Sequence, residues 1–176
     1  MNRVSRSPLN LGLMAMALVL AALATGCQEQ VADATAVGQA AKSVMINVVE
    51  IYNTGNTDLI DAVISPNYIG HYSIMSESVL GVEGFTQWVL TNRTAYPDFK
   101  VVINEMLAEG NLVCLQWTVT GTNTGPMPDR EPTGKPIRLT GLTLARIFEG
   151  KIVEEWITYD VLDLNRQLGV EAPSTI

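Results

Sequence analysis

Residues 141–160, GLTLARIFEGKIVEEWITYD, predict two long β-strands joined by a tight turn at Glu149-Gly150. Side chains two positions apart in a strand share a face, so we expect Trp156 and Asp160 to point the same way. A carboxylate beside a tryptophan in a mostly apolar strand is costly unless it is paired, neutral or used in chemistry. This stretch therefore directs the search for a functional site to Asp160.

The pattern before this hairpin is also that of a sheet. Runs of alternating apolar residues predict strands near 99–108, 111–122, 136–149 and 152–161. The connection 123–135, NTGPMPDREPTGK, is too long and too rich in proline and glycine for a tight hairpin, so we expect a loop over a site mouth.

The pattern nearer the N-terminus is helical. Apolar spacings of three and four predict helices at 37–52, 58–64 and 82–95, and a short closing helix at 162–169. A short strand or bend at 67–74 carries the only histidine, His71. Helices followed by antiparallel strands indicate an α+β fold, a curved antiparallel sheet wrapped over three helices. Such a sheet leaves an apolar pocket for a small ligand.

The first 26 residues have the features of an export signal. Arg3 and Arg6 precede an apolar run that is short for a membrane-spanning helix, and Ala24-Thr25-Gly26-Cys27 resembles the lipid-attachment motif of bacterial lipoproteins. We expect a signal peptide at 1–26, lipidation at Cys27, a polar tether over 27–36 and an exported, membrane-anchored protein. The alternative is an ordinary signal peptide with Cys27 incidental.

The charge of the mature chain argues against polyanionic partners. Removal of Arg3 and Arg6 takes the net charge from −7 to −9, which does not suit nucleic acid. Cys114 lies in the apolar run LVCLQWTV and is expected to be a buried small hydrophobic residue rather than a nucleophile. One histidine and no paired cysteines leave too few ligands for a metal site.

Nine short signatures occur in an order that resembles the SnoaL-like polyketide cyclases, often called ester cyclases. The resemblance covers residues 40–169 within an expected domain at 37–171. The signatures are Asn67-Tyr68 with His71, Gly81-Val82-Glu83-Gly84, Tyr96-Pro97-Asp98-Phe99, Glu109-Gly110-Asn111, Gly121-Thr122, Pro132-Thr133-Gly134-Lys135, Arg146-Ile147 before Glu149-Gly150-Lys151-Ile152, Trp156 with Asp160, and Gln167-Leu168-Gly169.

The resemblance implies the cone-shaped NTF2-like fold and a cofactor-free intramolecular aldol cyclisation of a small hydrophobic carbonyl compound. By position, Asp160 corresponds to the family's acid/base and His71 to its helper. A desolvated carboxyl suits this chemistry because burial brings its pKa toward the working pH. The alternatives are that Asp160 caps the closing helix and that His71 is partly exposed and bonded to a backbone carbonyl.

Aromatic residues are the expected pocket walls. Trp117 and Trp156 are placed on facing strands and Tyr52 near the end of the first helix, where its hydroxyl can reach a ligand. Core packing is the alternative for Trp117. Arg146 is expected to pair with Glu154 across the hairpin.

Three functions remain open. The first is a lyase- or isomerase-type enzyme with Asp160 and His71. The second is a non-catalytic lipoprotein that binds a small hydrophobic molecule, and the third is another reaction on the same fold, such as hydration, dehydration or epoxide opening. Val153 and Ile157, assigned to the outer sheet face, lead us to expect a homodimer.

Overall fold

The alternating segments of the C-terminal half form four consecutive antiparallel strands. In the computed structural model, which describes residues 35–128 and 130–170, these are β3 (Lys100–Glu109), β4 (Leu112–Thr122), β5 (Pro136–Phe148) and β6 (Lys151–Tyr159). β5 alternates buried and exposed side chains along its whole length, as a strand with one covered face must. The predicted strands are confirmed to within a few residues.

Two further strands complete an open six-stranded sheet in the order β2-β1-β6-β5-β4-β3. β1 (Ile64–Tyr72) is longer than the strand predicted at 67–74, and β2 (Val79–Leu80) is a short edge strand. β1 lies parallel to β6, while the other neighbours are antiparallel. The α+β class with a curved sheet is confirmed, with this one parallel pair as a detail that the strand pattern did not reveal.

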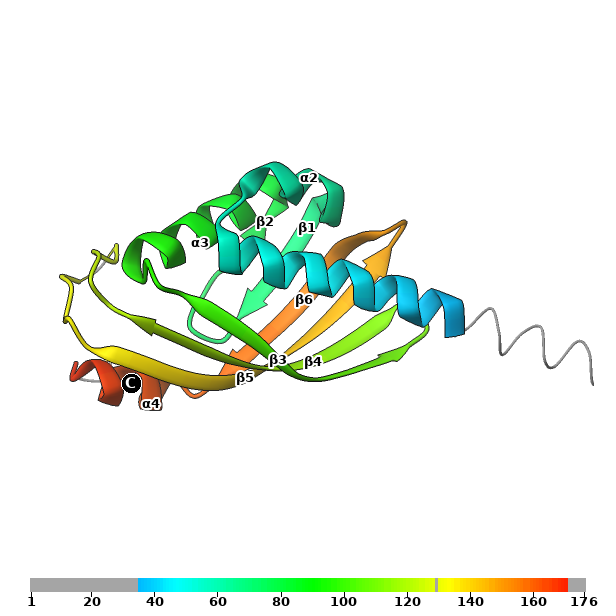
Figure 1. The fold of residues 1–176 in the computed structure, drawn as a ribbon. Helices are drawn as coiled ribbons and strands as arrows, with labels where there is room; N and C mark the ends of the chain where they lie inside the picture. The colour runs from blue at the N-terminus through cyan, green and yellow to red at the C-terminus, as the bar shows by residue number, and fades with distance from the viewer. Residues whose placement is uncertain (1–34, 129, 171–176) are drawn as a thin grey trace, which may run out of the picture. The chain divides into compact units, whose positions relative to one another are not determined.

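Helices cover one face of the sheet (Figure 1). They are the helix over residues 35–54, the short turns η1 (Thr57–Leu59) and α2 (Ile60–Val63), and α3 (Gly81–Ala95). The closing helix α4 (Val161–Leu168) packs against β5. Leu164 and Leu168 of α4 join a second apolar cluster with Ile137 and Leu139 of β5, so this helix closes one end of the covered face.

A bulge in β6 decides which of its side chains point inward. Arg146 of β5 pairs with Glu154, but the next residue, Ile147, pairs with Ile152, so Val153 is an extra residue. An extra residue reverses the alternation on either side of it. Ile152 and Glu155 are therefore both buried although they are three positions apart.

The structure corrects three expectations, two of them because of the bulge. Trp156 was placed inside but is 36% exposed on the outer face, and Ile157 was placed outside but packs against the core. Cys114, expected to be buried, is exposed, because Val113 and Leu115 take the inward positions of β4.

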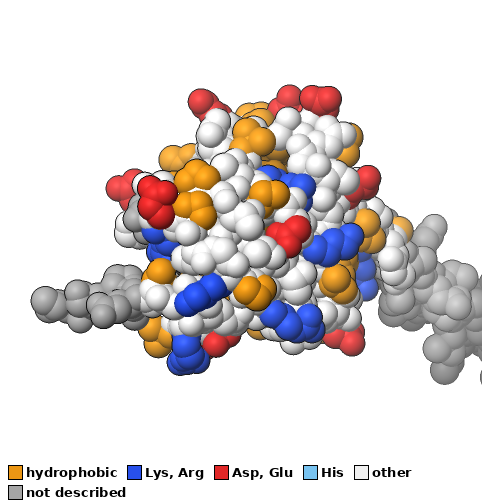
Figure 2. Space-filling view, turned by 60° about the vertical axis from the view of Figure 1, so that its left-hand side comes forward, with side chains coloured by type: hydrophobic (Ala, Val, Ile, Leu, Met, Phe, Trp, Pro, Cys, Tyr) orange, Lys and Arg blue, Asp and Glu red, His pale blue; other side chains and the backbone are white. Residues whose placement is uncertain are grey.

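The surface carries charges of both signs. Figure 2 shows acidic and basic side chains interspersed with hydrophobic ones over the face that it presents. Within the described residues, no helix has the length and apolar character needed to cross a bilayer. The predicted signal peptide, Cys27 and most of the tether lie outside the described residues.

Candidate functional site

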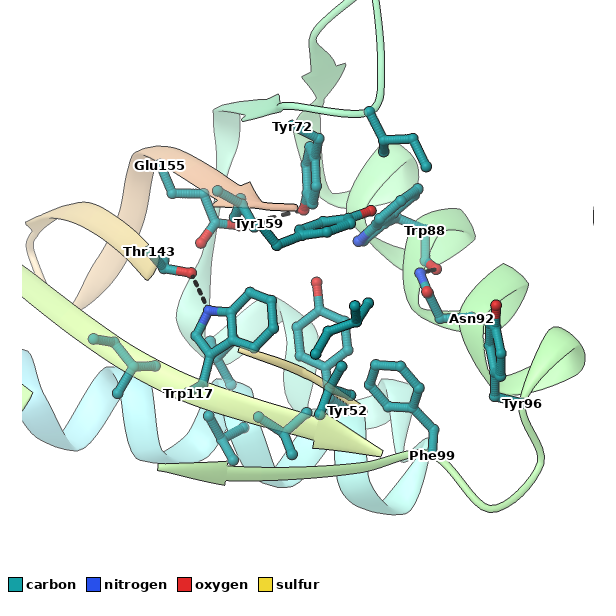
Figure 3. A pocket seen from close by; sticks show the side chains of 18 of the residues that line it. Tyr52, Tyr72, Trp88, Asn92, Tyr96, Phe99, Trp117, Thr143, Glu155 and Tyr159 are labelled. Carbon is teal, nitrogen blue, oxygen red and sulfur yellow. Dashed lines mark hydrogen bonds between the residues drawn. The ribbon is translucent and has the colours of Figure 1, made fainter. Parts of the chain in front are cut away.

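A cavity of about 130 Å³ lies between the helices and the covered face of the sheet. Its walls are mostly apolar and aromatic, with a few polar groups, which is the usual composition of a small-molecule site. The labelled side chains in Figure 3 are Tyr52, Tyr72, Trp88, Asn92, Tyr96, Phe99, Trp117, Thr143, Glu155 and Tyr159. The wall includes residues of the helix over 35–54, of α3 and α4, and of strands β1, β3, β4, β5 and β6.

Glu155 is the charged residue of this wall. It is 3% exposed, and its Oε1 accepts hydrogen bonds from the hydroxyls of Tyr68 and Tyr72, the latter at 3.3 Å. The two hydroxyls also lie 3.0 Å from each other. In Figure 3 the carboxyl group lies between Tyr72 and Thr143 on the cavity wall. One carboxyl oxygen is thus held by β1 while the group as a whole borders the cavity.

Gly70 makes room for this cluster. It pairs with Glu155 across the parallel β1–β6 ladder, and it lies between the inward-pointing Tyr68 and Tyr72. A Cβ atom at position 70 would overlap the Tyr68 hydroxyl and approach a ring carbon of Tyr72 to 2.6 Å. The absence of a side chain at Gly70 therefore lets three polar groups meet in the buried interior.

Burial raises the pKa of the Glu155 carboxyl to about 7, and the hydroxyls of Tyr68 and Tyr72 offset part of that rise. The pKa values of both tyrosines are raised well above 10, first by burial and then by nearby charges, including that of Glu155. The tyrosines therefore stay protonated as donors, while Glu155 exchanges its proton near neutral pH. A carboxyl in this state can serve as a general base and then as a general acid.

The predicted wall residues Tyr52 and Trp117 do line the cavity. Trp117 of β4 donates through Nε1 to Thr143 Oγ1 of β5 at 3.0 Å, which fixes its ring across the wall. The Tyr52 hydroxyl points into the cavity in Figure 3, and burial raises the pKa of Tyr52 above its ordinary value, so it remains a donor. Both residues are positioned to contact a ligand.

The structure places Asp160 elsewhere, and the expectation that it lies in the pocket is wrong. Asp160 is exposed at the end of β6 and is the N-cap of α4, where its Oδ1 accepts from the backbone N–H of Asp163 at 2.9 Å. This is the helix-capping alternative. Because of the bulge, Glu155, Ile157 and Tyr159 are the inward residues of the second part of β6. By the same alternation, Asp160 does not point toward the cavity.

His71 and Trp156 lie together on the outer face of the sheet. Their rings stack at 5.4 Å with 17° between the planes. His71 Nε2 lies 3.1 Å from Glu154 Oε1, and its Nδ1 lies 3.2 Å from Ser78 Oγ. Arg146 meets Glu154 at 3.8 Å, which confirms the predicted cross-hairpin pair. Neither His71 nor Trp156 lines the cavity.

Sequence reasoning missed Glu155 because it read the alternation of β6 from Ile152 without the bulge. The sequence carried no signal of the shift. Next to the turn, Phe148 pairs with Lys151 and Ile147 with Ile152, and counting on from these pairs would place Glu154 opposite the buried Ala145. His, Cys, Asp and Glu side chains of the described chain do not gather in groups that could hold a metal ion.

Comparison with known proteins identifies relatives of this fold. The family model of the SnoaL-like polyketide cyclases matches residues 42–168. No curated protein matches the chain by sequence.

Solved structures share the architecture. A Jannaschia sp. CCS1 protein named as a SnoaL-like polyketide cyclase superposes with a TM-score of 0.70 at 18% identity, covering 77% of this chain and 96% of that one. An Acidithiobacillus ferrooxidans protein named as a polyketide cyclase gives 0.66 at 28% identity, covering 74% and 94%. IdmH of Streptomyces antibioticus, also named as a polyketide cyclase, gives 0.64 at 23% identity, covering 74% and 99%.

Proposed function

Because the chain belongs to the SnoaL-like polyketide cyclase family, we propose that it catalyses cofactor-free acid/base chemistry on a small hydrophobic carbonyl compound. The reaction is an intramolecular aldol-type cyclisation or a related lyase or isomerase step. The observation that carries this proposal is Glu155, a buried carboxyl with a pKa of about 7 on the wall of an aromatic cavity. We therefore assign the acid/base role to Glu155 in place of Asp160.

The proposed reaction returns every proton that it takes. The Glu155 carboxylate removes a proton from a carbon next to a substrate carbonyl, and the resulting enolate attacks a second carbonyl of the same molecule. A carbon–carbon bond forms, and the new alkoxide recovers the proton from the Glu155 carboxylic acid. A group whose pKa lies near the working pH suits both transfers.

The surrounding side chains have distinct parts in this proposal. Tyr68 and Tyr72 hold Glu155 Oε1 and set the direction of the carboxyl group. The Tyr52 hydroxyl, which points into the cavity, donates to the carbonyl oxygen as charge develops on it. Trp117 provides a flat apolar wall against which a conjugated substrate packs.

A probe reaction tests the base directly. β-Tetralone is a flat ketone with acidic C–H bonds beside its carbonyl, and exchange of these hydrogens for deuterium is followed by NMR. We expect the wild-type protein to accelerate exchange, and Glu155→Gln to lose roughly a hundredfold or more of that acceleration. Asp160→Asn serves as the matched control, with wild-type rates. Equal rates in wild type and Glu155→Gln would remove Glu155 from the mechanism.

A second candidate is a binding protein without catalysis. The hydrogen bonds from Tyr68 and Tyr72 to Glu155 Oε1 would also be needed in a protein that only binds a ligand, because a buried carboxyl requires hydrogen-bond partners whether or not it reacts. Under this alternative β-tetralone binds, but its hydrogens exchange no faster with the protein than with buffer.

A further inference from the structure

The described side chains that line the cavity include an acidic group but no basic one. Among the described residues that form its wall, Glu155 is the one acidic side chain, and lysine, arginine and histidine are absent. The exterior, in contrast, carries both signs (Figure 2). A ligand that enters the cavity therefore meets a negative group and no cation to pair with an anion of its own.

Arg130, a basic side chain outside this wall, lies near Tyr96 and does not contribute to the pKa shift of Glu155. Arg130 binds Asn165 Oδ1 at 3.3 Å and lies close enough to Tyr96 to favour ionisation of its hydroxyl, against the larger effect of burial. Figure 3 shows Tyr96 and Glu155 on opposite sides of the cavity. The Glu155 end is thus negative without compensation from a basic side chain.

Aromatic side chains surround the Glu155 end. Tyr72, which donates to Glu155, has its ring centroid 4.5 Å from that of Trp88, and Trp117 meets Tyr159 at 6.1 Å. Figure 3 shows these rings and Tyr52 around a common space. The faces of aromatic rings attract cations, most strongly where water is excluded.

We propose that the cavity selects its ligands by charge: it favours flat molecules that place a protonated amine at Glu155 over neutral carbonyl isosteres, and it excludes carboxylates. The inference rests on the proposed function in placing the reactive end of the substrate at Glu155. Folding has already desolvated Glu155, so an arriving ammonium group must lose only its own hydration, while a carboxylate would lose hydration and meet repulsion. The natural substrate accordingly presents no free acid at this end, and amines that mimic it are inhibitors.

Three probes with one aromatic body test the proposal: β-naphthylmethylamine, β-acetonaphthone and β-naphthoate. Their dissociation constants are measured by calorimetry at about pH 8, above the pKa of Glu155, where the amine is still protonated. For the wild type we expect the amine to bind at least about tenfold more tightly than the ketone, and the carboxylate at least about tenfold more weakly.

Two variants assign the effect to one group. Glu155→Gln is expected to bring the three constants within about threefold of one another. Glu154→Gln removes the same charge from the outer face of the same strand and is expected to keep the wild-type order. If Glu155→Gln fails to fold, the order of the three probes in the wild type still decides the matter.

A wild-type protein that binds the carboxylate as tightly as the ketone would overturn the proposal, and so would an unchanged order in folded Glu155→Gln. Binding at equilibrium is independent of turnover. If the charge order holds while β-tetralone does not exchange, the catalytic proposal fails and charge selection stands. If β-tetralone exchange depends on Glu155 but the three probes do not bind in the expected order, the catalytic proposal stands and charge selection fails.

Discussion

Glu155 links the chemistry of the cavity to the stability of the fold. The pKa of its carboxyl rises from an ordinary 4.5 to about 7 because folding removes water from around it. Between these two values the folded protein holds a proton on Glu155 that the unfolded chain has released. The free energy of unfolding therefore falls as the pH rises through this window.

The size of this effect is measurable by urea unfolding at about pH 5 and about pH 8. We expect a contribution of roughly 3 kcal/mol at most to be lost across the window, since one pKa unit corresponds to about 1.4 kcal/mol. Glu155→Gln has no carboxyl to titrate, so its unfolding free energy should lack this component. A wild type and a variant with the same pH dependence would show that Glu155 does not titrate in this range.

Asp160 has a structural role that its own variant should reveal. As the N-cap of α4 it accepts a hydrogen bond from the backbone of Asp163. We expect Asp160→Ala to lower the free energy of unfolding by about 1 kcal/mol, as lost caps usually do, and to leave β-tetralone exchange unchanged. Thermal unfolding and the exchange assay, run on the same preparation, check both halves. A large loss of β-tetralone exchange in a folded Asp160→Ala protein would show that Asp160 takes part in the reaction.

At the scale of elements, the pairing of β1 with β6 assembles the site. The parallel ladder brings Gly70 opposite Glu155, and the bulge at Val153 turns Glu155 rather than Glu154 toward the helices. Neither feature is visible in a single strand's alternation, because both depend on the partner strand. The four C-terminal strands and the longer helices were predictable, since their spacing of apolar residues is regular, whereas the start of β1 and the short β2 were not.

Gly70→Ala tests this assembly. The added methyl group would overlap Tyr68 and Tyr72, so we expect a loss of roughly 1–3 kcal/mol in unfolding free energy and slower β-tetralone exchange. Gly38→Ala is the matched control, because its added Cβ would lie 3.5 Å from Ala108 at an ordinary contact distance, in a helix that favours alanine. If Gly70→Ala is as stable and active as the control, the cluster of Tyr68, Tyr72 and Glu155 does not require a glycine at position 70.

The candidate site was predictable only in part, for a related reason. Tyr52 and Trp117 face the cavity as expected, since both lie on regular elements without a shift before them. Trp156 and Asp160 follow the bulge in β6, so the alternation that placed them inside was out by one residue. His71 points outward from β1. The strand predicted there was too short to show which of its alternating side chains face the core.

At the scale of the whole molecule, the outer sheet face bears on assembly. Leu144 pairs with Trp156 on β6 and with Cys114 on β4, and Leu142, Leu144 and Trp156 are all exposed. Arg146 and Glu154 border this cluster with opposite charges. A two-fold arrangement of two copies can bury such a cluster and match its charges, so we propose a homodimer through this face.

Sedimentation of the wild type and Leu144→Glu tests the dimer. We expect the wild type to sediment as a dimer at micromolar concentration, and the variant as a monomer because a carboxylate would be buried at the contact. Leu80→Glu, at an exposed position of edge strand β2, is the control and should stay dimeric. A monomeric wild type would contradict the assignment.

We also propose that the mature protein is an exported lipoprotein held through Cys27, a residue that lies outside the described part of the chain. Metabolic labelling with an alkynyl fatty acid should mark the wild type and not Cys27→Ala. Cys114→Ala, which removes the other cysteine, should label like the wild type. Absence of label from the wild type would indicate an ordinary cleaved signal or another destination.

The pH dependence of β-tetralone exchange tests most directly whether Glu155 is the base of this cavity. The rate should rise about tenfold per pH unit while Glu155 is protonated and level off above its pKa of about 7. Asp160→Asn should reproduce this profile, and Glu155→Gln should lose it together with most of the rate. A Glu155→Gln protein that is folded and keeps the wild-type rate and profile would contradict the assignment of Glu155.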